Sequence, residues 1–496
     1  MQTHADAQAA AAEVQAAAAD ARAAQPAWRA MGFRRRGLAL GKARARFVAE
    51  RNAIVAAMAA EHGKSEAETY FVELLVSFDL FDYWLDNAEK LLAPEMLPLD
   101  PVKFPAKRGK IVYEPKGLIG VISTWNYPIN LPLRSLIPAL MAGNAVLYKP
   151  SEHAVAAGEI LERIFRDALP PGVLQTVRGA GDVGAEVVDA VDHVCFTGSG
   201  ETGRKVASRC AERLITCSLE LGGKAAAIVL ADADLDRAIN GILWAKFHTA
   251  GQNCSAVERI YVAQSVAEAF TARFAEAARK LQVSTEGPWA MLPLRTPRQR
   301  DNVAHQVDQA RAAGAKVLCG GAPGETDLGY QATVVVAAPE ECDLLTRETF
   351  GPAVAIVPVA DAAEAVRKAN ASDLGLSASI WTRDLELGER LAAQLEVGVA
   401  IVNNACFTGP MPFAPWGGRK LSGHGCTGSH LAVRELVHPK TILIDAEKAP
   451  HELWWYPYTP TRLGIARKLF LILSGQAGLS DVLALLRLMP RRFRDS

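Results

Sequence analysis

A cysteine in a polar turn is the residue of this sequence best suited to covalent chemistry. Cys254 closes the segment GQNC at 251–254, which indicates a turn, whereas Cys195 lies in an apolar run. A thiolate is nucleophilic near neutral pH, and a helix N-terminus or a nearby cation increases its fraction. A buried structural thiol is the alternative and the commoner role of a cysteine. His248 lies six residues upstream as a candidate base for a Cys–His pair, but packed histidines are commoner and no orienting third group is visible.

Two further polar side chains follow apolar segments. Glu220 lies in LELGGK, directly before a glycine pair, which suits a functional carboxylate at the end of a strand. Asn126 lies in STWNYP, where an amide on a rigid turn can donate a hydrogen bond to a developing oxyanion. The alternative for Asn126 is a turn-capping role, which is commoner for asparagine in general.

A glycine-rich turn precedes a predicted helix. In FTGSGETG at 196–203, Gly198, Gly200 and Gly203 have the GxGxxG spacing. Such a turn directs backbone amides and a helix N-terminus towards a phosphate, although a glycine turn without a ligand is the alternative. A dinucleotide fingerprint also requires an acid about 20 residues later to bind the ribose. Glu220, 17 residues past Gly203, can be assigned that role, but its place before a second glycine pair suits a functional carboxylate at least as well.

Two more strand-end segments carry weaker signals. YKPSE at 148–152 offers Lys149 and Glu152, which can bind sugar hydroxyls or form a solvated ion pair. ETFGP at 348–352 combines an acid, an aromatic ring and a Gly-Pro turn, and it is uninformative alone. Together with the segments above, these turns predict one site that holds a nucleophile, a carboxylate and an amide donor.

Alternating apolar and helical stretches predict the scaffold that positions these residues. Strands are expected at 118–124, 145–149 and 193–198, each followed by a helix. Repeated strand–turn–helix units imply right-handed crossovers and a mainly parallel sheet. A second series of such units begins near Lys224 and continues through 353–370. The predicted fold is therefore an interleaved α/β body whose ligands collect at the carboxyl ends of the strands.

The sequence before the first predicted strand has a different composition. Ala-rich sequence predicts helix over the first ninety residues. The Pro-rich, extended sequence that follows predicts a hairpin at 98–113 that protrudes or pairs with another segment.

Composition excludes several classes of protein. A chain of 496 residues is too long for one hydrophobic core, which predicts two large lobes. The 54 basic residues balance 54 acidic residues, so no global field draws the chain to nucleic acid. Eight cysteines without a CxxC pair argue against a disulfide framework or a zinc site and favour reduced thiols in a cytoplasmic protein. No signal peptide and no uninterrupted apolar run of membrane-spanning length is visible.

From about Pro26 to Asp445 the sequence resembles the NAD(P)-dependent aldehyde dehydrogenase superfamily. Seven motifs occur in the order and approximate spacing of that family: EPKGLIGVISTWNYP, LYKPSE, FTGSGETG, LELGGK, GQNC, ETFGP and PWGGRKLSGHG. The WNYP segment and the later WWYPYTPTRL are similar to the class 3 branch, which includes fatty, aromatic and coniferyl aldehyde dehydrogenases. The resemblance implies NAD(P)-dependent oxidation of a medium- or long-chain aliphatic or aromatic aldehyde to its acid.

The resemblance also implies roles for the candidate residues. Cys254 is expected to attack the aldehyde carbonyl, and the Asn126 amide and the Cys254 backbone N–H are expected to hold the resulting oxyanion. Hydride passes to NAD or NADP and leaves a thioester, and Glu220 is expected to activate the water that hydrolyses it. The expected cofactor contacts are Gly198, Ser199 and Gly203 in the glycine turn at the pyrophosphate, Lys149 and Glu152 at the adenosine ribose, Glu348 at the nicotinamide ribose, and Phe350 and Trp125 nearby.

The family fold implies three parts and a tail. A cofactor-binding domain is expected at 1–97 and 114–222, and a catalytic domain at 223–433. A small β extension, at 98–113 and 434–447, is expected to pair protomers into a homodimer or a dimer of dimers. Residues 448–496 form a basic tail outside these parts.

Both ends of the chain fall outside the resemblance. The Ala-rich first 25 residues are expected to form a loose helix or to be disordered. From Thr461 the tail carries leucines at helical spacing and seven basic residues against two acids. It can lie on a membrane surface or pack on the protein's own dimer, and packing on the dimer is slightly favoured. The basic residues are Arg462, Arg467, Lys468, Arg487, Arg491, Arg492 and Arg494.

Three rival functions remain open. In a CoA-acylating relative, CoA replaces water, but such relatives generally lack the glutamate found here at 220. A non-catalytic protein that keeps the fold predicts no NADH formation with any aldehyde. A thiol hydrolase that uses Cys254 and His248 needs no nicotinamide.

Overall fold

The computed structural model describes residues 4–101, 103–407, 409 and 411–491. The chain divides into two compact units. One comprises Met1–Ala93 and Tyr113–Lys440, and it contains both large sheets and every candidate site residue. The other comprises Pro94–Val112 and Thr441–Ser496. Arg492 and Arg494 of the predicted basic tail lie outside the described residues.

Helices occupy most of residues 4–91, as the Ala-rich sequence predicts. A single π-helical turn at Tyr70–Leu74 lies between the fourth and fifth of these helices. The helices are α1 (His4–Ala30), α2 (Gly32–Ala49), α3 (Arg51–His62), α4 (Glu66–Thr69) and α5 (Leu75–Leu91).

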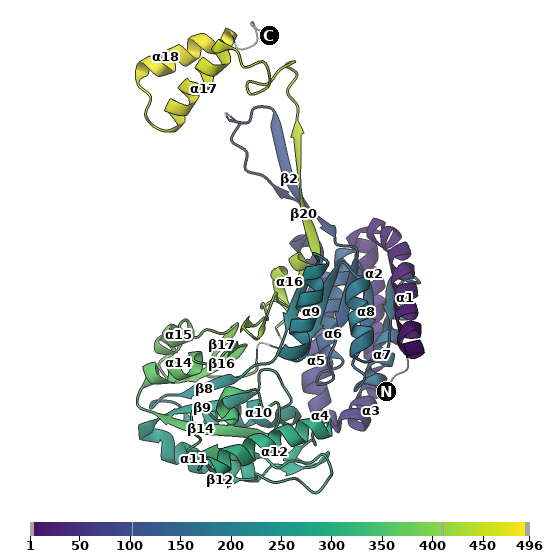
Figure 1. The fold of residues 1–496 in the computed structure, drawn as a ribbon, viewed down its shortest axis with the longest axis vertical. Helices are drawn as coiled ribbons and strands as arrows, with labels where there is room; N and C mark the ends of the chain where they lie inside the picture. The colour runs from purple at the N-terminus through teal and green to yellow at the C-terminus, as the bar shows by residue number, and fades with distance from the viewer. Residues whose placement is uncertain (1–3, 102, 408, 410, 492–496) are drawn as a thin grey trace. The chain divides into compact units, whose positions relative to one another are not determined.

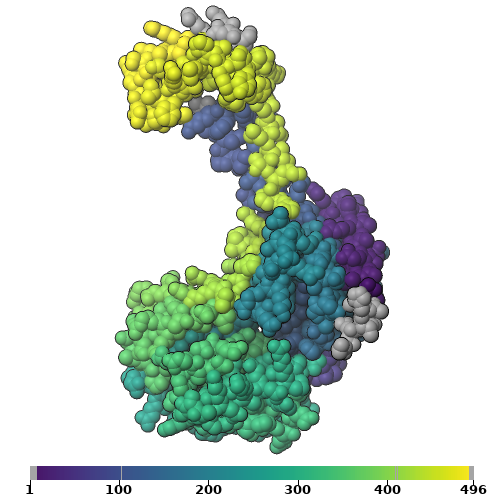
Figure 2. Space-filling view, in the orientation of Figure 1, coloured from purple at the N-terminus to yellow at the C-terminus, as the bar shows by residue number. Residues whose placement is uncertain are grey.

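Helix α1 is part of the packed body, so the prediction of a loose or disordered first segment is wrong. Val14, Ala18 and Ala21 on one face of α1 are buried in a core cluster, and Arg22 pairs with Asp192 at 2.8 Å. Helix α1 lies beside α8 (Gly181–Ala190), on the outside of the surrounding helices (Figures 1 and 2). Small side chains allow close helix packing without a stripe of large apolar residues.

The first sheet has six strands in the order β19-β7-β6-β3-β4-β5. All neighbouring pairs are parallel except β19 and β7. The strands are β3 (Leu118–Ile122), β4 (Ala145–Lys149), β5 (Leu174–Thr176), β6 (His193–Thr197), β7 (Thr216–Glu220) and β19 (Gly423–His424). Helices α6 (Asn130–Ala142), α7 (Val155–Arg166), α8 and α9 (Gly200–Glu212) follow these strands (Figure 1). The three strands predicted at 118–124, 145–149 and 193–198 are confirmed as β3, β4 and β6.

The second sheet has seven strands in the order β12-β13-β14-β9-β8-β16-β17, and only β12 runs antiparallel to its neighbour. Its strands are β8 (Ala225–Val229), β9 (Val257–Ala263), β12 (Lys316–Cys319), β13 (Thr333–Val336), β14 (Ala353–Val359), β16 (Ser377–Trp381) and β17 (Val399–Val402). The helices around it are α10 (Leu235–Phe247), α11 (Gln264–Arg279), α12 (Pro297–Ala312), α13 (Asp343–Thr346), α14 (Ala362–Asn370) and α15 (Leu385–Ala392). The predicted α/β class with two mainly parallel sheets is confirmed.

Four residues link the two sheets, because β7 ends at Glu220 and β8 begins at Ala225. The Ser422 hydroxyl fastens this link: it donates to the Gly222 carbonyl at 2.7 Å and accepts from the Gly375 N–H at 3.0 Å. The link therefore lies at the carboxyl end of β7, where ligands of such sheets bind. Strand β19 falls within the predicted catalytic segment 223–433, yet it pairs with the first sheet. Among the described strands that begin at residue 225 or later, β19 alone does so.

Short elements complete the first unit: β10 (Gln282–Val283) pairs with β11 (Ala290–Met291), β15 (Leu374–Gly375) pairs with β18 (Arg419–Lys420), and α16 (Ser429–Glu435) follows β19.

A three-stranded sheet contains the predicted β extension, with the order β1-β2-β20. Its strands are β1 (Glu95–Met96), β2 (Lys107–Pro115) and β20 (Val437–Asp445). Lys107 pairs with Asp445 and Glu452 at 2.8 and 2.6 Å. The tail forms α17 (Pro460–Leu473), α18 (Leu479–Leu488) and a short turn at Met489–Arg491, and Lys468 pairs with Asp481 at 2.6 Å. None of the described helices combines the length and apolar character needed to cross a bilayer.

Candidate active site

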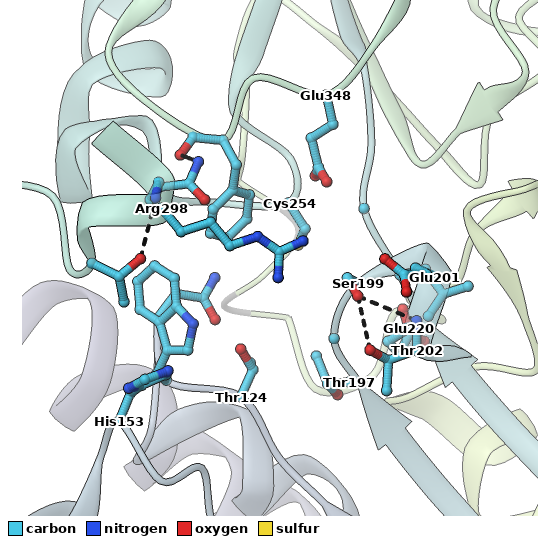
Figure 3. A pocket seen from close by; sticks show the side chains of 18 of the residues that line it. Thr124, His153, Thr197, Ser199, Glu201, Thr202, Glu220, Cys254, Arg298 and Glu348 are labelled. Atoms are coloured by element: carbon cyan, nitrogen blue, oxygen red, sulfur yellow. Dashed lines mark hydrogen bonds between the residues drawn. The ribbon is translucent and has the colours of Figure 1, made fainter. Parts of the chain in front are cut away.

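A crevice of about 580 Å³ gathers most of the candidate residues of the first unit. Its walls come from the carboxyl ends of β3, β6 and β7 and from loops of the second sheet (Figure 3). The candidates among its lining residues are Trp125, Asn126, Gly198, Ser199, Glu220, Cys254, Glu348 and Phe350. Lys149, Glu152 and Gly203 do not line it. Segments far apart in the sequence thus meet around one space.

The Cys254 thiol is accessible from this crevice. It follows a tight turn in which Thr249 and Ala250 have positive φ angles of 52° and 54°, and Gly251 has φ 71°. A Cβ at Gly251 would lie 2.4 Å from the Gly351 carbonyl oxygen, so only glycine fits there. The Cys254 side chain is half-buried, and its Sγ lies 3.7 Å from Asn253 Oδ1.

Cys254 also borders a second cavity, of about 110 Å³. Most of the other residues that line this cavity are apolar or aromatic. Among its described lining residues, Arg134 is the one with a charged side chain. The thiol therefore stands where the two cavities meet. The second lining comprises Phe71, Val72, Val76, Tyr127, Asn130, Leu131, Arg134, Trp244, His248, Asn253, Cys254, Ser255, Cys406, Gly409 and Trp416.

The electrostatics of the crevice favour protonated acids. Burial raises the pKa of the Cys254 thiol, the charges of Glu220 and Glu348 raise it further, and Arg134 lowers it. Burial also raises the pKa of Glu220 well above its ordinary value, with Arg134 opposing. A catalytic base works best when its pKa lies near the operating pH, and burial moves Glu220 in that direction.

Glu220 is the last residue of β7 and is 8% exposed. Neither carboxylate oxygen has a partner at hydrogen-bond geometry among the described residues. The Trp416 indole and the Thr427 amide are close enough to lower the pKa of Glu220 slightly. A buried carboxylate without a firm partner is costly for stability, which is typical of a group kept for chemistry.

Asn126 lies on the loop between β3 and α6. Its Nδ2 donates to the Gln252 carbonyl at 3.0 Å, and its Oδ1 has no partner among the described residues. A carboxamide nitrogen carries two N–H donors, so one remains for a ligand. Gln252 precedes Cys254 by two residues, and this hydrogen bond therefore ties the amide to the thiol's own turn.

His248 does not form the pair with Cys254 that a thiol hydrolase requires. Its Nδ1 lies 2.7 Å from the Trp244 carbonyl, and its Nε2 lies 3.0 Å from both Tyr127 Oη and Asn253 Nδ2. The ring also stacks on Trp244, at 4.3 Å between centroids. His248 is therefore a packed histidine, and burial lowers its pKa.

The glycine turn forms a helix N-terminus, as its spacing predicts. Ser199 is the N-cap of α9: its Oγ accepts from the Thr202 N–H at 3.3 Å and donates to Thr202 Oγ1 at 3.1 Å (Figure 3). Gly203 faces the body instead of the crevice, since a Cβ there would lie 2.5 Å from Leu221 Cδ2. Gly203 therefore lets α9 pack closely on the link between the sheets.

Glu348 and Phe350 form the opposite wall with Trp125. The Glu348 carboxylate accepts from the Gly223 N–H at 3.0 Å and points towards Cys254 in Figure 3. Burial and the neighbouring charge of Glu258 raise the pKa of Glu348 to about 8. The Phe350 and Trp125 rings meet edge to face, with centroids 5.7 Å apart.

Lys149 and Glu152 form an ion pair of 3.4 Å beyond the carboxyl end of β4. Lys149 is buried and Glu152 is 45% exposed. Because Lys149 is buried, the pair differs from the solvated pair of the sequence alternative, and the Glu152 carboxylate remains accessible.

Sequence reasoning missed two buried charged groups that shape the site. Glu258 accepts from the Thr349 and Phe350 N–H groups at 2.9 and 2.8 Å and pairs with Lys224 at 2.6 Å, which fixes the loop of Glu348. Arg134 donates to the Asn130 side chain and the Gly409 carbonyl, and its Nη1 has no partner among the described residues. Neither charge stands in a recognisable pattern in the sequence, so no signal marked them.

Comparison with known proteins gives the arrangement a family. The model of the aldehyde dehydrogenase family matches residues 2–442. The chain is 38% identical to a 4,4'-diapolycopene aldehyde oxidase of Methylomonas sp. over 80% of this chain and 75% of the relative. It is 39% identical to "Putative succinate-semialdehyde dehydrogenase [NADP(+)] 2" of Mycobacterium tuberculosis over 74% of this chain and 71% of the relative. Among solved structures, a Mycobacterium tuberculosis aldehyde dehydrogenase complexed with NAD+ superposes with a TM-score of 0.83 at 30% identity, covering 88% of this chain and 92% of that one.

Three findings indicate the same family: the family model spans most of the chain, the relatives are near 40% identical, and the fold is shared. The chain therefore belongs to the aldehyde dehydrogenase family, as an NAD(P)-dependent aldehyde dehydrogenase.

Proposed function

We propose that the protein oxidises an aldehyde to a carboxylic acid through a covalent intermediate on Cys254. The raised pKa makes the thiolate the minor form of Cys254, and it forms by loss of the thiol proton to solvent in the crevice. The thiolate adds to the carbonyl carbon, and the carbonyl oxygen becomes an oxyanion held by Asn126 Nδ2 and the Cys254 N–H. Collapse of this thiohemiacetal expels hydride and leaves a thioester. Glu220 removes a proton from water, which attacks the thioester carbonyl; the C–S bond breaks and releases the acid and the thiolate.

The observation that carries this proposal is the position of Cys254 between two cavities. One extends from the N-terminus of α9 to the thiol and suits a dinucleotide, because helix N-termini bind phosphate. The other has an apolar lining that suits an aldehyde's organic part. When bound, NAD or NADP supplies the acceptor for the hydride.

We propose cofactor contacts that follow the same geometry. Gly198 and Ser199 bind the pyrophosphate at the N-terminus of α9, and Gly203 supports that turn. Glu348 binds the nicotinamide ribose beside Trp125 and Phe350. Lys149 and Glu152 bind the adenosine ribose, with Glu152 accessible to hydroxyl groups. In this assignment residues 1–97 and 114–222 hold the cofactor, and residues 223–433 carry the nucleophile.

Water, and not CoA, is the proposed acceptor of the acyl group. Glu220 lines the same crevice as Cys254, and its carboxylate oxygens have no competing hydrogen bond among the described residues. Turnover assays with and without CoA test this assignment. Free acid is expected in both, and acyl-CoA formation would transfer the protein to the acylating type.

We propose an aldehyde with an apolar body, medium- or long-chain aliphatic or aromatic, as in the class 3 branch. Aromatic and aliphatic side chains such as Phe71, Val76 and Trp416 line the second cavity, and one relative is named a 4,4'-diapolycopene aldehyde oxidase. Arg134 favours a second candidate, an aldehyde that also bears a carboxylate, because its unpaired Nη1 can bind one.

A panel of aldehydes separates these candidates. Hexanal, decanal, cinnamaldehyde and succinate semialdehyde are assayed with each dinucleotide, in the natural protein and in Arg134→Leu. If the apolar aldehydes are the substrates, their kcat/KM exceeds that of the semialdehyde by about 10-fold or more, since each buried methylene contributes about 0.8 kcal/mol. If the semialdehyde is preferred and Arg134→Leu selectively lowers its kcat/KM, the carboxylate-bearing substrate replaces the apolar one.

We propose that protomers pair through the β1-β2-β20 sheet and that α17 and α18 pack on the resulting dimer. Exposed apolar side chains on the two helices require such a cover; they include Leu463, Phe470, Leu473, Leu479 and Leu486. The alternative is contact with a membrane surface.

Co-sedimentation with anionic vesicles distinguishes packing of the tail on the dimer from its contact with a membrane surface. The full chain and a chain truncated after Thr461 are expected to remain equally in the supernatant, and the truncated chain is expected to dimerise more weakly in sedimentation velocity. Selective pelleting of the full chain would establish the membrane alternative.

A further inference from the structure

A buried ion pair lies behind the Asn126 loop and takes no part in the proposed chemistry. Lys64 Nζ and Glu73 Oε1 are 2.7 Å apart, and the side chains are 1% and 0% exposed. Neither residue lines the crevice or the second cavity. Lys64 follows the end of α3, and Glu73 lies in the π-helical turn at Tyr70–Leu74.

The remaining hydrogen bonds of this pair end on the Asn126 loop. Lys64 Nζ donates to the Asn126 carbonyl at 2.7 Å and lies 4.4 Å from the centroid of the Tyr127 ring. Glu73 Oε2 accepts from the Asn130 N–H at 2.8 Å. One ion pair thus holds the loop at both ends, from Asn126 to the first residue of α6.

The other side of Asn126 is held by the nucleophile's own turn. Its Nδ2 donates to the Gln252 carbonyl, while Gln252 Nε2 donates to the Thr249 carbonyl at 3.1 Å and Gln252 Oε1 accepts from the Arg295 N–H at 2.8 Å. The Asn126 loop is therefore held by the nucleophile's turn on one side and by the Lys64–Glu73 pair on the other.

The π-helical turn explains how the chain reaches this arrangement. Such turns are rare and are frequent at functional sites. An extra residue in a turn rotates the following residues by about 100°, given 3.6 residues per turn. Here Glu73 points inward with no exposure, while Phe71 and Val72 of the same turn line the second cavity.

Stability alone does not account for the pair. Burying two charges costs several kcal/mol for each ion, and well-packed apolar replacements are often neutral or stabilising. A buried pair whose hydrogen bonds converge on one catalytic loop is better explained by what it positions.

We propose that Lys64 and Glu73 are positioning residues, which hold the Asn126 backbone so that its side-chain amide stays directed at the oxyanion formed on Cys254. The inference rests on the proposed role of Asn126 in aldehyde oxidation. The pair acts through Asn126 and touches neither the aldehyde nor the dinucleotide.

The test uses the full chain with the double substitution Lys64→Met/Glu73→Gln, which leaves no unpaired buried charge and keeps an acceptor for the Asn130 N–H. The single-turnover rate of NADH formation is expected to fall about 10- to 100-fold, below the 10²–10³-fold loss for removing an oxyanion donor outright. The dissociation constant of the dinucleotide and the KM of the aldehyde are expected to stay within about 2-fold, because the pair lines neither cavity.

A double-mutant cycle with Asn126→Ala separates positioning from general destabilisation. In the Asn126→Ala background, the double substitution is expected to cause no further loss of rate. Two outcomes would overturn the positioning role and leave the proposed function intact. One is that the rate losses of the double substitution and of Asn126→Ala multiply when they are combined; the other is full activity of the folded double variant. Full activity of Asn126→Ala would instead remove the proposed role of Asn126.

Two further variants complete the design. Arg163→Met/Glu50→Gln removes a partly buried pair, 2.8 Å apart, whose residues line neither cavity, and it is expected to lower the melting temperature without changing the rate. If the main double variant does not fold, Lys64→Arg keeps the charge but displaces the donor atom. It is then expected to slow NADH formation only when Asn126 is present, and slowing in both backgrounds would contradict the proposal.

Discussion

Glu220→Gln is expected to produce one rapid turnover of NADH per active site and then to stall. Hydride leaves before Glu220 is needed, so the burst survives, whereas the thioester lacks the base that activates water. Glutamine keeps the shape of the side chain, and burial of its neutral amide leaves the fold intact. Steady-state turnover is expected to fall by about 10²–10⁴-fold, the usual contribution of a general base. Stopped-flow absorbance of NADH measures both phases, and undiminished steady-state turnover would remove Glu220 from its role.

The pH dependence of the slow step follows from the raised pKa of Glu220. Burial favours the protonated carboxyl, and only the ionised form can accept a proton from water. Turnover limited by deacylation is therefore expected to rise with pH through the pKa of Glu220. Arg134 opposes the shift, so Arg134→Leu is expected to move this rise to higher pH. A rise that Glu220→Gln leaves in place would belong to another group.

Cys254→Ser is expected to lower dehydrogenase turnover by a factor on the order of 10⁴–10⁶, because loss of a covalent nucleophile removes the whole reaction path. A serine hydroxyl is a far weaker nucleophile than a thiolate near neutral pH. His248 cannot activate it, since both ring nitrogens are engaged elsewhere. Binding of the dinucleotide, followed by quenching of protein fluorescence, is expected to stay near normal.

Cys319→Ser is the matched control for this loss. Cys319 is a half-buried thiol on β12, at an edge of the seven-stranded sheet, and it lines neither cavity of the active site. Its replacement is expected to leave turnover unchanged. Substantial turnover by Cys254→Ser would place the nucleophile on another residue.

Much of the scaffold could be predicted because short-range patterns determine it. The apolar run at 145–149 has the bounds of β4, and the glycine spacing at 198–203 marks the start of α9. The α/β class and the position of the candidate residues at strand ends followed from the same repeated units. The family resemblance then gave roles to residues such as Glu220 and Cys254, which their strand-end turns had already placed in one predicted site.

The errors and omissions come from long-range packing. Helix α1 contains few large apolar residues, and its burial depends on the fit of Val14, Ala18 and Ala21 against segments distant in sequence. Arg134 and Glu258 are single charges within an ordinary helix and strand, while Lys64 lies in a loop and Glu73 in the π-helical turn, and no sequence motif marks any of them. Their importance depends on burial and on partners such as Asn126, 62 residues from Lys64, which composition and periodicity do not reveal.

Mass spectrometry of acid-quenched Glu220→Gln after its first turnover tests the central claim most directly. With decanal and NAD, the protein is expected to gain the mass of one decanoyl group, located by proteolysis on the peptide that contains Cys254. An unmodified Cys254 peptide in a sample that has released one equivalent of NADH, or an acyl group on a different residue, would contradict the thioester on this thiol.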